Sequence, residues 1–173
     1  FMDMSTPASG MSLALYALSA IEAAATRNPD TDKILNFVRS PFSFLNEHEI
    51  SLVEDYCIRW NINGKMWLSD FAADSDLSDF EEINTIRKKI IEPLSALNTA
   101  SKSSTGKEIA KAFNKFLEDI KLAEHAKAMI EDSPLTERTE NARLFKQLWN
   151  ALMLCVSSVY LTAGDTKMSL KSF

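Results

Sequence analysis

Apolar residues recur at steps of three and four along most of this chain, which is the spacing of one helical face. The longest such run lies between residues 140 and 163, and Gly164 follows it as an expected C-terminal cap in the left-handed backbone. Because apolar residues cover so much of this run, we predict a central core helix with other helices on several sides. Its apolar positions are Phe145, Leu148, Trp149, Leu152, Val156, Val159 and Tyr160, widened by Leu144, Ala151, Met153 and Cys155.

Helix-start signals divide the rest of the chain into further helices. A capping residue followed three positions later by Glu forms the pattern of a capping box. Pro93 lies inside an apolar stripe, so we expect it to kink or restart that helix. The helices before the long one are predicted to begin near residues 11, 31, 46, 78, 105 and 122. The expected capping boxes are Asn46 with Glu49, Ser78 with Glu81, and Thr105 with Glu108.

Turn and loop signals separate these helices. Asn63-Gly64 is a turn signal, residues 65–71 read as a loop, and the acidic residues 72–78 are the expected exposed loop. Residues 98–104 form a polar loop. No run alternates apolar and polar residues in the manner of a strand. We therefore predict an all-α fold, an irregular bundle of about six to seven helices around the long C-terminal helix, with residues 1–173 as a single domain.

Composition bounds the class of protein. The chain has 173 residues with 46% hydrophobic and 25% charged residues, as expected of a soluble globular domain. Its net charge of −5 gives no global basic signal, so any nucleic-acid binding would have to be local. Cys57 and Cys155 lie on apolar patterns and are interpreted as small buried hydrophobes, which fits a reducing, cytoplasmic setting.

The ends of the chain carry no targeting signal that we can identify. No stretch of ~18 uninterrupted apolar residues predicts a membrane span, and the start FMDMSTPASG lacks the basic residues of a secretory signal. The chain begins with Phe1 and ends in MSLKSF, where Ser169 could cap a further helix. We interpret the sequence as a fragment of a longer chain.

Residue types with catalytic potential do not cluster in the sequence. The two histidines, His48 and His125, have no partner at metal-ligand spacing, and the four glycines are isolated, so no phosphate-binding loop is present. No serine is flanked by glycines, and neither cysteine has basic neighbours. We therefore predict no catalytic residue, no metal site and no cofactor within these residues.

Basic residues form the only candidate binding surface. Three of them are consecutive, and three others recur every four residues and would form one stripe that can follow a phosphate backbone. Lys65 lies beside Trp67, whose ring could stack on a base. The alternative is that the lysines are an ordinary solvated helix face and that Trp67 fills the core. The candidate phosphate contacts are Lys65, Arg87, Lys88, Lys89, Lys107, Lys111 and Lys115.

A series of short phrases resembles the B subunit of the AddAB (RexAB) helicase–nuclease of Firmicutes. In that family a Leu-Glu-Asn-Tyr block precedes a Gly-Ile-x-Gly-x-x-Trp-like turn, an Ile-Arg-x-x-Ile-x-x-Pro-Leu helix and a Trp-Asn-Ala-Leu helix. This chain departs from it at Asp55, where the family usually has Asn. The phrases here are FMD at residues 1–3, EISLVEDY at 49–56, NINGKMW at 61–67, IRKKIIEPL at 86–94 and LWNAL at 148–152.

The resemblance implies a specific context. The parent protein would process double-strand breaks for recombination together with an AddA-type partner, and this stretch resembles the helical 2B insertion of its second motor domain. The ATP, Mg and iron–sulfur sites of the family lie elsewhere in the parent, so the resemblance assigns no catalytic or cofactor residue here. It implies DNA and the AddA-type subunit as partners, no membrane, and a cytoplasmic location.

We therefore expect a non-catalytic helical domain that supports contacts with DNA or with the partner subunit. A free-standing helical module for protein–protein interaction is the alternative, and an exposed apolar patch without nearby basic residues would favour it.

Overall fold

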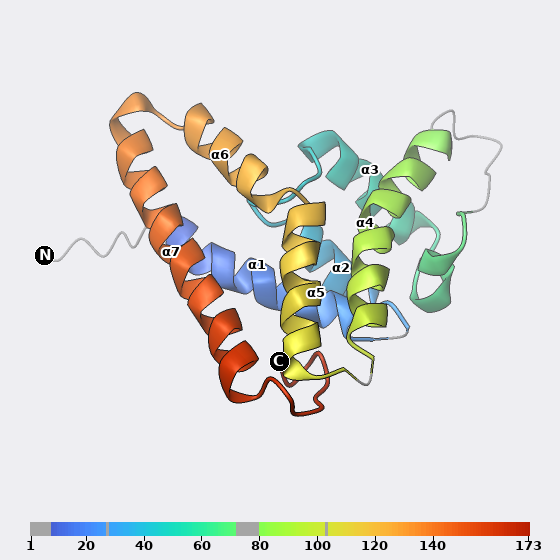
Figure 1. Ribbon diagram of the computed structural model, residues 1–173. Coiled ribbons are helices and arrows are strands. Elements are labelled where there is room, and N and C mark those ends of the chain that lie inside the picture. The colour runs from blue at the N-terminus through green and yellow to red at the C-terminus, as the bar shows by residue number, and fades with distance from the viewer. Residues whose placement is uncertain (1–7, 27, 72–79, 103) are drawn as a thin grey trace, which may run out of the picture.

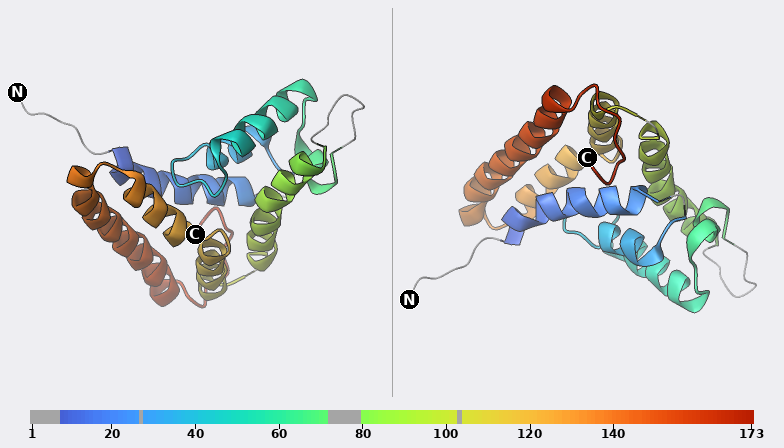
Figure 2. Two further views of the ribbon diagram at one scale, coloured as in Figure 1. Left: turned by 90° about the horizontal axis from the view of Figure 1, so that it is seen from above. Right: turned by 90° about the horizontal axis from the view of Figure 1, so that it is seen from below.

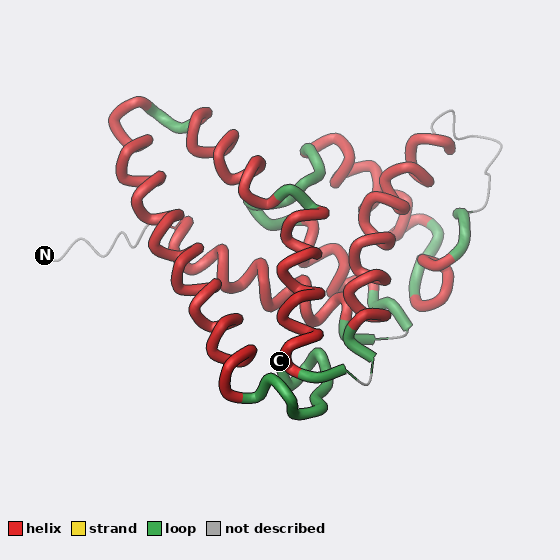
Figure 3. The backbone as a smooth tube through the Cα atoms, viewed as in Figure 1, coloured by secondary structure: helices red, strands yellow, loops and turns green. Residues whose placement is uncertain are grey.

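The fold is built from helices alone. The computed structural model describes residues 8–26, 28–71, 80–102 and 104–173, and within them the only β-type pairing is an isolated bridge between Thr105 and Lys167 (Figure 3). The predicted all-α bundle is confirmed. The elements are α1 (Ala8–Ala24), α2 (Thr31–Val38), α3 (Glu47–Arg59), the 3-10 helix η1 (Gly64–Leu68), α4 (Phe80–Ala100), α5 (Gly106–Asp119), α6 (Leu122–Asp132) and α7 (Leu135–Thr162).

Two of the predicted capping boxes form. The Asn46 side chain accepts from the Glu49 backbone N–H at 2.9 Å, and the Glu49 carboxylate accepts from the Asn46 N–H at 3.0 Å. Thr105 and Glu108 make the same reciprocal pair at the start of α5. Each box satisfies backbone donors that the first turn of a helix leaves open. The third predicted box, at Ser78, and the loop expected over residues 72–78 lie outside the described residues.

Helix α4 runs through Pro93 as one helix to Ala100, so the restart predicted at this proline is wrong, and the polar loop begins later than expected. Proline inside a helix costs about 3 kcal/mol because it removes a hydrogen bond and crowds the preceding turn. Burial on both sides of Pro93 offsets that cost. The buried apolar residues of α4 are Ile83, Ile86, Ile90, Ile91, Leu94 and Leu97.

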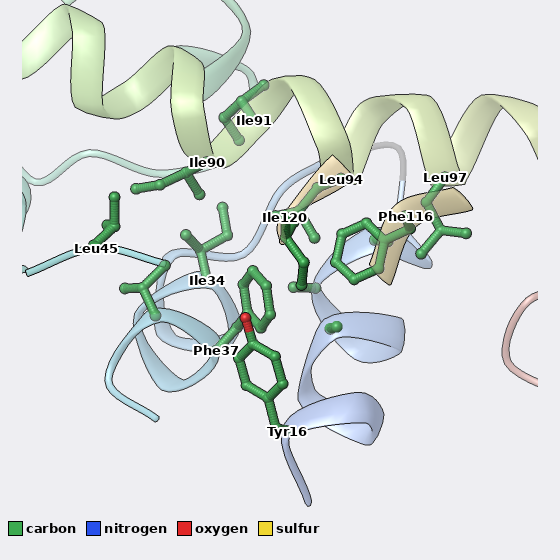
Figure 4. Packing of buried hydrophobic residues seen from close by; sticks show 14 of the residues in the cluster. Tyr16, Ile34, Phe37, Leu45, Ile90, Ile91, Leu94, Leu97, Phe116 and Ile120 are labelled. Atoms are coloured by element: carbon green, nitrogen blue, oxygen red, sulfur yellow. The ribbon is translucent and has the colours of Figure 1, made fainter. Parts of the chain in front are cut away.

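The core lies where α1, α2, α4 and α5 meet, and Figure 4 shows their side chains converging. Tyr16 of α1 stacks on Phe37 of α2 with ring centroids 4.9 Å apart, and Phe37 approaches Phe116 of α5 at 6.1 Å. Burial raises the pKa of the Tyr16 hydroxyl far above its usual range. Two pairs of consecutive helices, α1 with α2 and α4 with α5, thus share one apolar interior.

The long helix α7 is not central. It forms a hairpin with α6 along one edge of the molecule and packs sideways on α1 and α5 (Figures 1 and 2). Val156 is its single buried residue, whereas Ala151, Leu154 and Cys155 are exposed. The predictions of a core helix and of a buried Cys155 are therefore wrong, while Cys57 is buried as predicted. An apolar pattern reports which faces avoid water but not what covers them.

The end of α7 meets the start of α5 at two glycines. The backbone N–H groups of Gly106 and Lys107 donate to the carbonyls of Thr166 and Gly164, both at 3.1 Å. A Cβ on Gly106 would lie 2.5 Å from the Ala163 carbonyl oxygen, so only glycine allows this approach. Gly164 is not left-handed as predicted. Instead its carbonyl accepts from the Lys107 N–H of α5.

Helix α7 is also, among the described residues, the one helix long and apolar enough to cross a membrane by length and composition. Only 6% of its most apolar 18-residue window is buried within the fold. Its inner side nevertheless packs against α1, α5 and α6. The expectation that no segment meets a membrane stays a prediction.

Candidate nucleic-acid interface

Arg87 is buried rather than presented to a ligand. Its side chain is 6% exposed and lies on the inner side of α4. The guanidinium donates to the Asp70 carboxylate, to the Trp67 carbonyl at 3.0 Å and to the Asn84 amide oxygen at 3.2 Å, and it lies over the Phe71 ring. These contacts anchor the segment after η1 to α4. The structure therefore gives Arg87 a structural role and removes it from the set of exposed phosphate contacts.

Trp67 is also structural. It is fully buried, and its indole N–H donates to the Thr31 hydroxyl at 2.9 Å. The interpretation of this ring as a core side chain is confirmed, so it does not offer a stacking surface. Lys65, two residues earlier in η1, is exposed. The expected pair of a cation and an exposed ring therefore reduces to Lys65 alone.

The two lysines after Arg87 are accessible but already face carboxylates. The Lys88 ammonium lies 3.7 Å from Asp70, and that of Lys89 pairs with Glu49 of α3. Both lysine side chains are about half exposed, at 53% and 49%. An exposed pair such as Lys88 with Asp70 contributes about 0–1 kcal/mol, so a phosphate could displace that carboxylate at little cost. The Glu49 side chain is only 13% exposed, so Lys89 is the less available of the two lysines.

The predicted stripe on α5 is present, with a different environment at each position. Lys107 is engaged at the α5–α7 junction, where its ammonium lies 3.0 Å from Asp165 and over the Tyr160 ring. The Asp165 carboxylate raises the Lys107 pKa. Lys111 is exposed and has no ion pair with any described residue, and Lys115 pairs with Asp119 at 3.3 Å. Lys111 and Lys115 are thus more available to a ligand than Lys107.

The two basic clusters approach each other at one end only, where Lys115 of α5 pairs with Asp119, a residue that lines the same cavity as Lys89. Lys107 faces the end of α7, whereas Lys89 faces α3 and lines a cavity of about 540 Å³ beside α6. Two cavity residues, Lys121 and His125, were not predicted to contribute to a binding surface. No sequence signal could have placed them beside Lys89, because the cavity depends on how α4 meets the α5–α6 turn. Glu92 and Asp119 also line it, so its charge is mixed.

No metal centre is assembled from the part of the chain that the structure describes: no group of three potential ligands among its His, Cys, Asp and Glu residues converges. His48 has only Glu82 nearby, at 3.7 Å. Within these residues the arrangement offers exposed cations to an anionic partner.

Comparison with known proteins gives a consistent relationship. No protein-family model matches the chain. Curated relatives named as the B subunit of an ATP-dependent helicase/deoxyribonuclease align with all of it: that of Clostridium botulinum strain Hall is 28% identical, that of Caldanaerobacter subterraneus 24%, and that of Clostridioides difficile 23%. The chain spans about 16% of the length of each of these relatives.

Each of these alignments covers all of this chain, so the similarity is not a chance match of short phrases. The resemblance predicted from the sequence is confirmed: over its whole length this chain is similar to one stretch of the B subunit of the ATP-dependent helicase/deoxyribonuclease of Firmicutes.

Proposed function

We propose that this chain is a non-catalytic helical domain of the B subunit of a helicase/deoxyribonuclease that acts in double-strand-break repair and recombination. The observation that carries the proposal is that the whole chain aligns with about 16% of the length of a relative that bears this name. The parent would hydrolyse ATP and cleave DNA with residues outside this stretch. Its ATP, Mg and iron–sulfur sites would lie there as well, and the complex would work in the cytoplasm with an AddA-type subunit.

Within such a protein, the role of this domain would be to support the DNA duplex or the partner. The accessible cations on η1, α4 and α5 support the first of these roles, since positively charged side chains bind the phosphate backbone without reading bases. Five of the seven predicted contacts remain candidates on grounds of exposure and pairing: Lys65, Lys88, Lys89, Lys111 and Lys115.

The test measures duplex DNA binding by the native-length protein as a function of salt. The double variant Lys111→Ala/Lys115→Ala is expected to weaken binding and to reduce the slope of log Kd against log salt by about 0.9 for each phosphate that is no longer neutralised. A second variant, Lys65→Ala/Lys88→Ala, tests the other surface in the same way.

The matched control is Lys127→Ala/Lys146→Ala, which removes two exposed lysines that belong to neither cluster. This control is expected to leave the slope unchanged. If both test variants also keep the wild-type slope, these lysines do not contact DNA. The domain would then serve the partner subunit or the rest of its own chain.

A stand-alone helical interaction module is the second candidate, and the exposed apolar residues of α7 favour it. The native reading frame distinguishes the two. A glycine-rich phosphate loop or its remnant upstream and a cysteine cluster downstream would support the helicase–nuclease subunit. A start near Met2 with a stop just after Phe173 would support the module.

A further inference from the structure

The second half of α7 exposes a face that has no charge. Between Lys146 and Asp165 the sequence contains no Asp, Glu, Lys or Arg, although 25% of the chain is charged. Leu154 is 68% exposed and Leu161 79% exposed. Figures 1 and 2 show this helix on the outside edge of the molecule from each direction. Gln147, Asn150 and Ser157 are exposed in this half as well. We call the following subset of its exposed residues the α7 outer face: Ala151, Leu154, Cys155, Ser158, Leu161 and Thr162.

The hydroxyl groups of the α7 outer face are already satisfied within the helix. Ser158 donates to the Leu154 carbonyl at 2.8 Å, and Thr162 donates to the Ser158 carbonyl at 2.7 Å. A hydroxyl that keeps its hydrogen bond can leave water at little cost, whereas an unpaired one cannot. The small side chains at 151, 155 and 158 would also let another backbone approach closely. The face is therefore suited to being covered.

The first half of the same helix provides an internal comparison. There the exposed positions include Glu137, Glu140, Arg143 and Lys146, and Arg143 pairs with Glu140 at 2.6 Å. This is the ordinary composition of a solvent-facing helix surface. The change from charged to uncharged residues occurs along one helix. If the second half of α7 faced water in the whole protein, we would expect charged residues there too, and the sequence has none.

We propose that the α7 outer face is an intramolecular interface, covered by an apolar surface of the same polypeptide from outside residues 1–173. The inference rests on the proposed function, because relatives of this chain are long enough that it spans about 16% of their length. An uncharged face with internally bonded hydroxyls is typical of permanent contacts, whereas transient interfaces carry more polar groups.

A membrane is the less suitable occupant. The length and composition of α7 would suit a helix that crosses a bilayer, but Glu140, Arg143 and Lys146 lie exposed in its first half. The inner side of the helix is also engaged by α1 and α5. A second copy of the chain is the other possible occupant, and the experiment below separates it from the proposed one.

Cys155 reports directly on whether the face is covered. We would measure alkylation of each cysteine by mass spectrometry in the native-length protein, purified without lipid, DNA or partner. Cys57 is the internal control, because burial within this domain should protect it in any folded form. The expected result is that Cys155 reacts at least about tenfold more slowly than in the urea-unfolded protein and that dilution does not change its rate.

A variant pair makes the test specific to this face. Leu154→Glu is expected to restore fast labelling of Cys155 while Cys57 stays protected, because a carboxylate placed in an apolar interface forces it open. Ala142→Glu, at an exposed position in the charged half of α7, is expected to leave Cys155 protected.

Three results would overturn the proposal. The first is fast labelling of Cys155 in the folded native-length protein. The second is protection that disappears on about hundredfold dilution, which would indicate a second copy, and the third is protection that appears only when phospholipid vesicles are added. The intact mass separates this failure from that of the proposed function. A native chain no longer than the present one would contradict both, whereas a chain as long as the relatives with a reactive Cys155 would contradict only the interface.

Discussion

At the scale of single residues, the guanidinium of Arg87 shows how a charged side chain can serve the fold. It is held by an amide oxygen, a backbone carbonyl and a carboxylate, and it lies 5.7 Å from the centre of the Phe71 ring. Asn84 completes the arrangement by accepting from the Phe71 backbone N–H at 2.8 Å. A buried charge is tolerated because each of the three guanidinium nitrogens has a partner.

Replacing Arg87 should therefore affect stability before it affects any ligand. Arg87→Ala removes the guanidinium donor to the Trp67 carbonyl and one of the two donors to the Asn84 amide oxygen. An unsatisfied buried group costs about 1–3 kcal/mol. We expect a clear loss in the free energy of unfolding, measured by urea denaturation. Lys88→Ala, next in sequence but exposed, is the control and should change it by less than about 0.5 kcal/mol.

Equal, small effects of the two substitutions would contradict the structural role of Arg87. Its inward position has a signal in the sequence: residue 87 lies four positions after Ile83 and three before Ile90, on the same face of the helix. Grouping it with Lys88 and Lys89 as one basic run overlooks this periodicity.

At the scale of elements, the contact between the start of α5 and the end of α7 joins two helices that are more than 50 residues apart. The open N–H groups in the first turn of α5 donate to backbone carbonyls just after α7, so these donors are satisfied by the other helix end. Lys107 adds an ion pair with Asp165 across the same junction. This contact positions the outer edge of the molecule relative to its core.

Gly106→Ala tests the junction. Its methyl group would collide with the Ala163 carbonyl oxygen, so the helices must separate, and overpacking of this kind costs about 1–3 kcal/mol. The expected result is a lower free energy of unfolding in urea, although alanine has the higher helix propensity. Asn114→Ala, at an exposed position of the same helix, is the control. A Gly106→Ala variant as stable as wild type would show that the close approach is not required.

At the scale of the whole molecule, burial is unevenly distributed. Helices α4 and α5 contribute many buried residues to the shared interior, whereas α6 contributes two and α7 one. Segments with few buried apolar contacts open locally at lower free energy than the core. The α6–α7 hairpin is therefore the less stable part when the present residues stand alone.

Hydrogen exchange of the 173-residue chain measures this difference. We expect the amides of α4 and α5 to be the most protected and those of α7 to exchange at least about tenfold faster, because local opening frees them without global unfolding. Uniform protection from α4 to α7 would show instead that the edge and the core unfold as one unit. The lysines proposed for DNA lie on the stable part, so their variants report binding rather than opening.

The sequence by itself determined where the α-helices lie and where several of them begin, but it gave residues 65–71 as a loop where the structure has the 3-10 helix η1. The boxes at Asn46 and Thr105 and the turn at Asn63-Gly64 depend on groups a few residues apart, and local chemistry decides them. It did not reveal that α4 would continue through Pro93, because the compensating burial comes from residues on other helices. The motifs also indicated the relationship to the helicase/deoxyribonuclease family, which periodicity alone could not do.

Only the tertiary structure decided which way each face points and what covers it. The same apolar spacing describes α4, which is buried, and α7, whose outer face is open. Contacts such as Lys89 with Glu49 and Lys107 with Asp165 join residues 40 and 58 positions apart. Burial and pairing at that range depend on how the helices assemble, and a helix carries its pattern without specifying its neighbours.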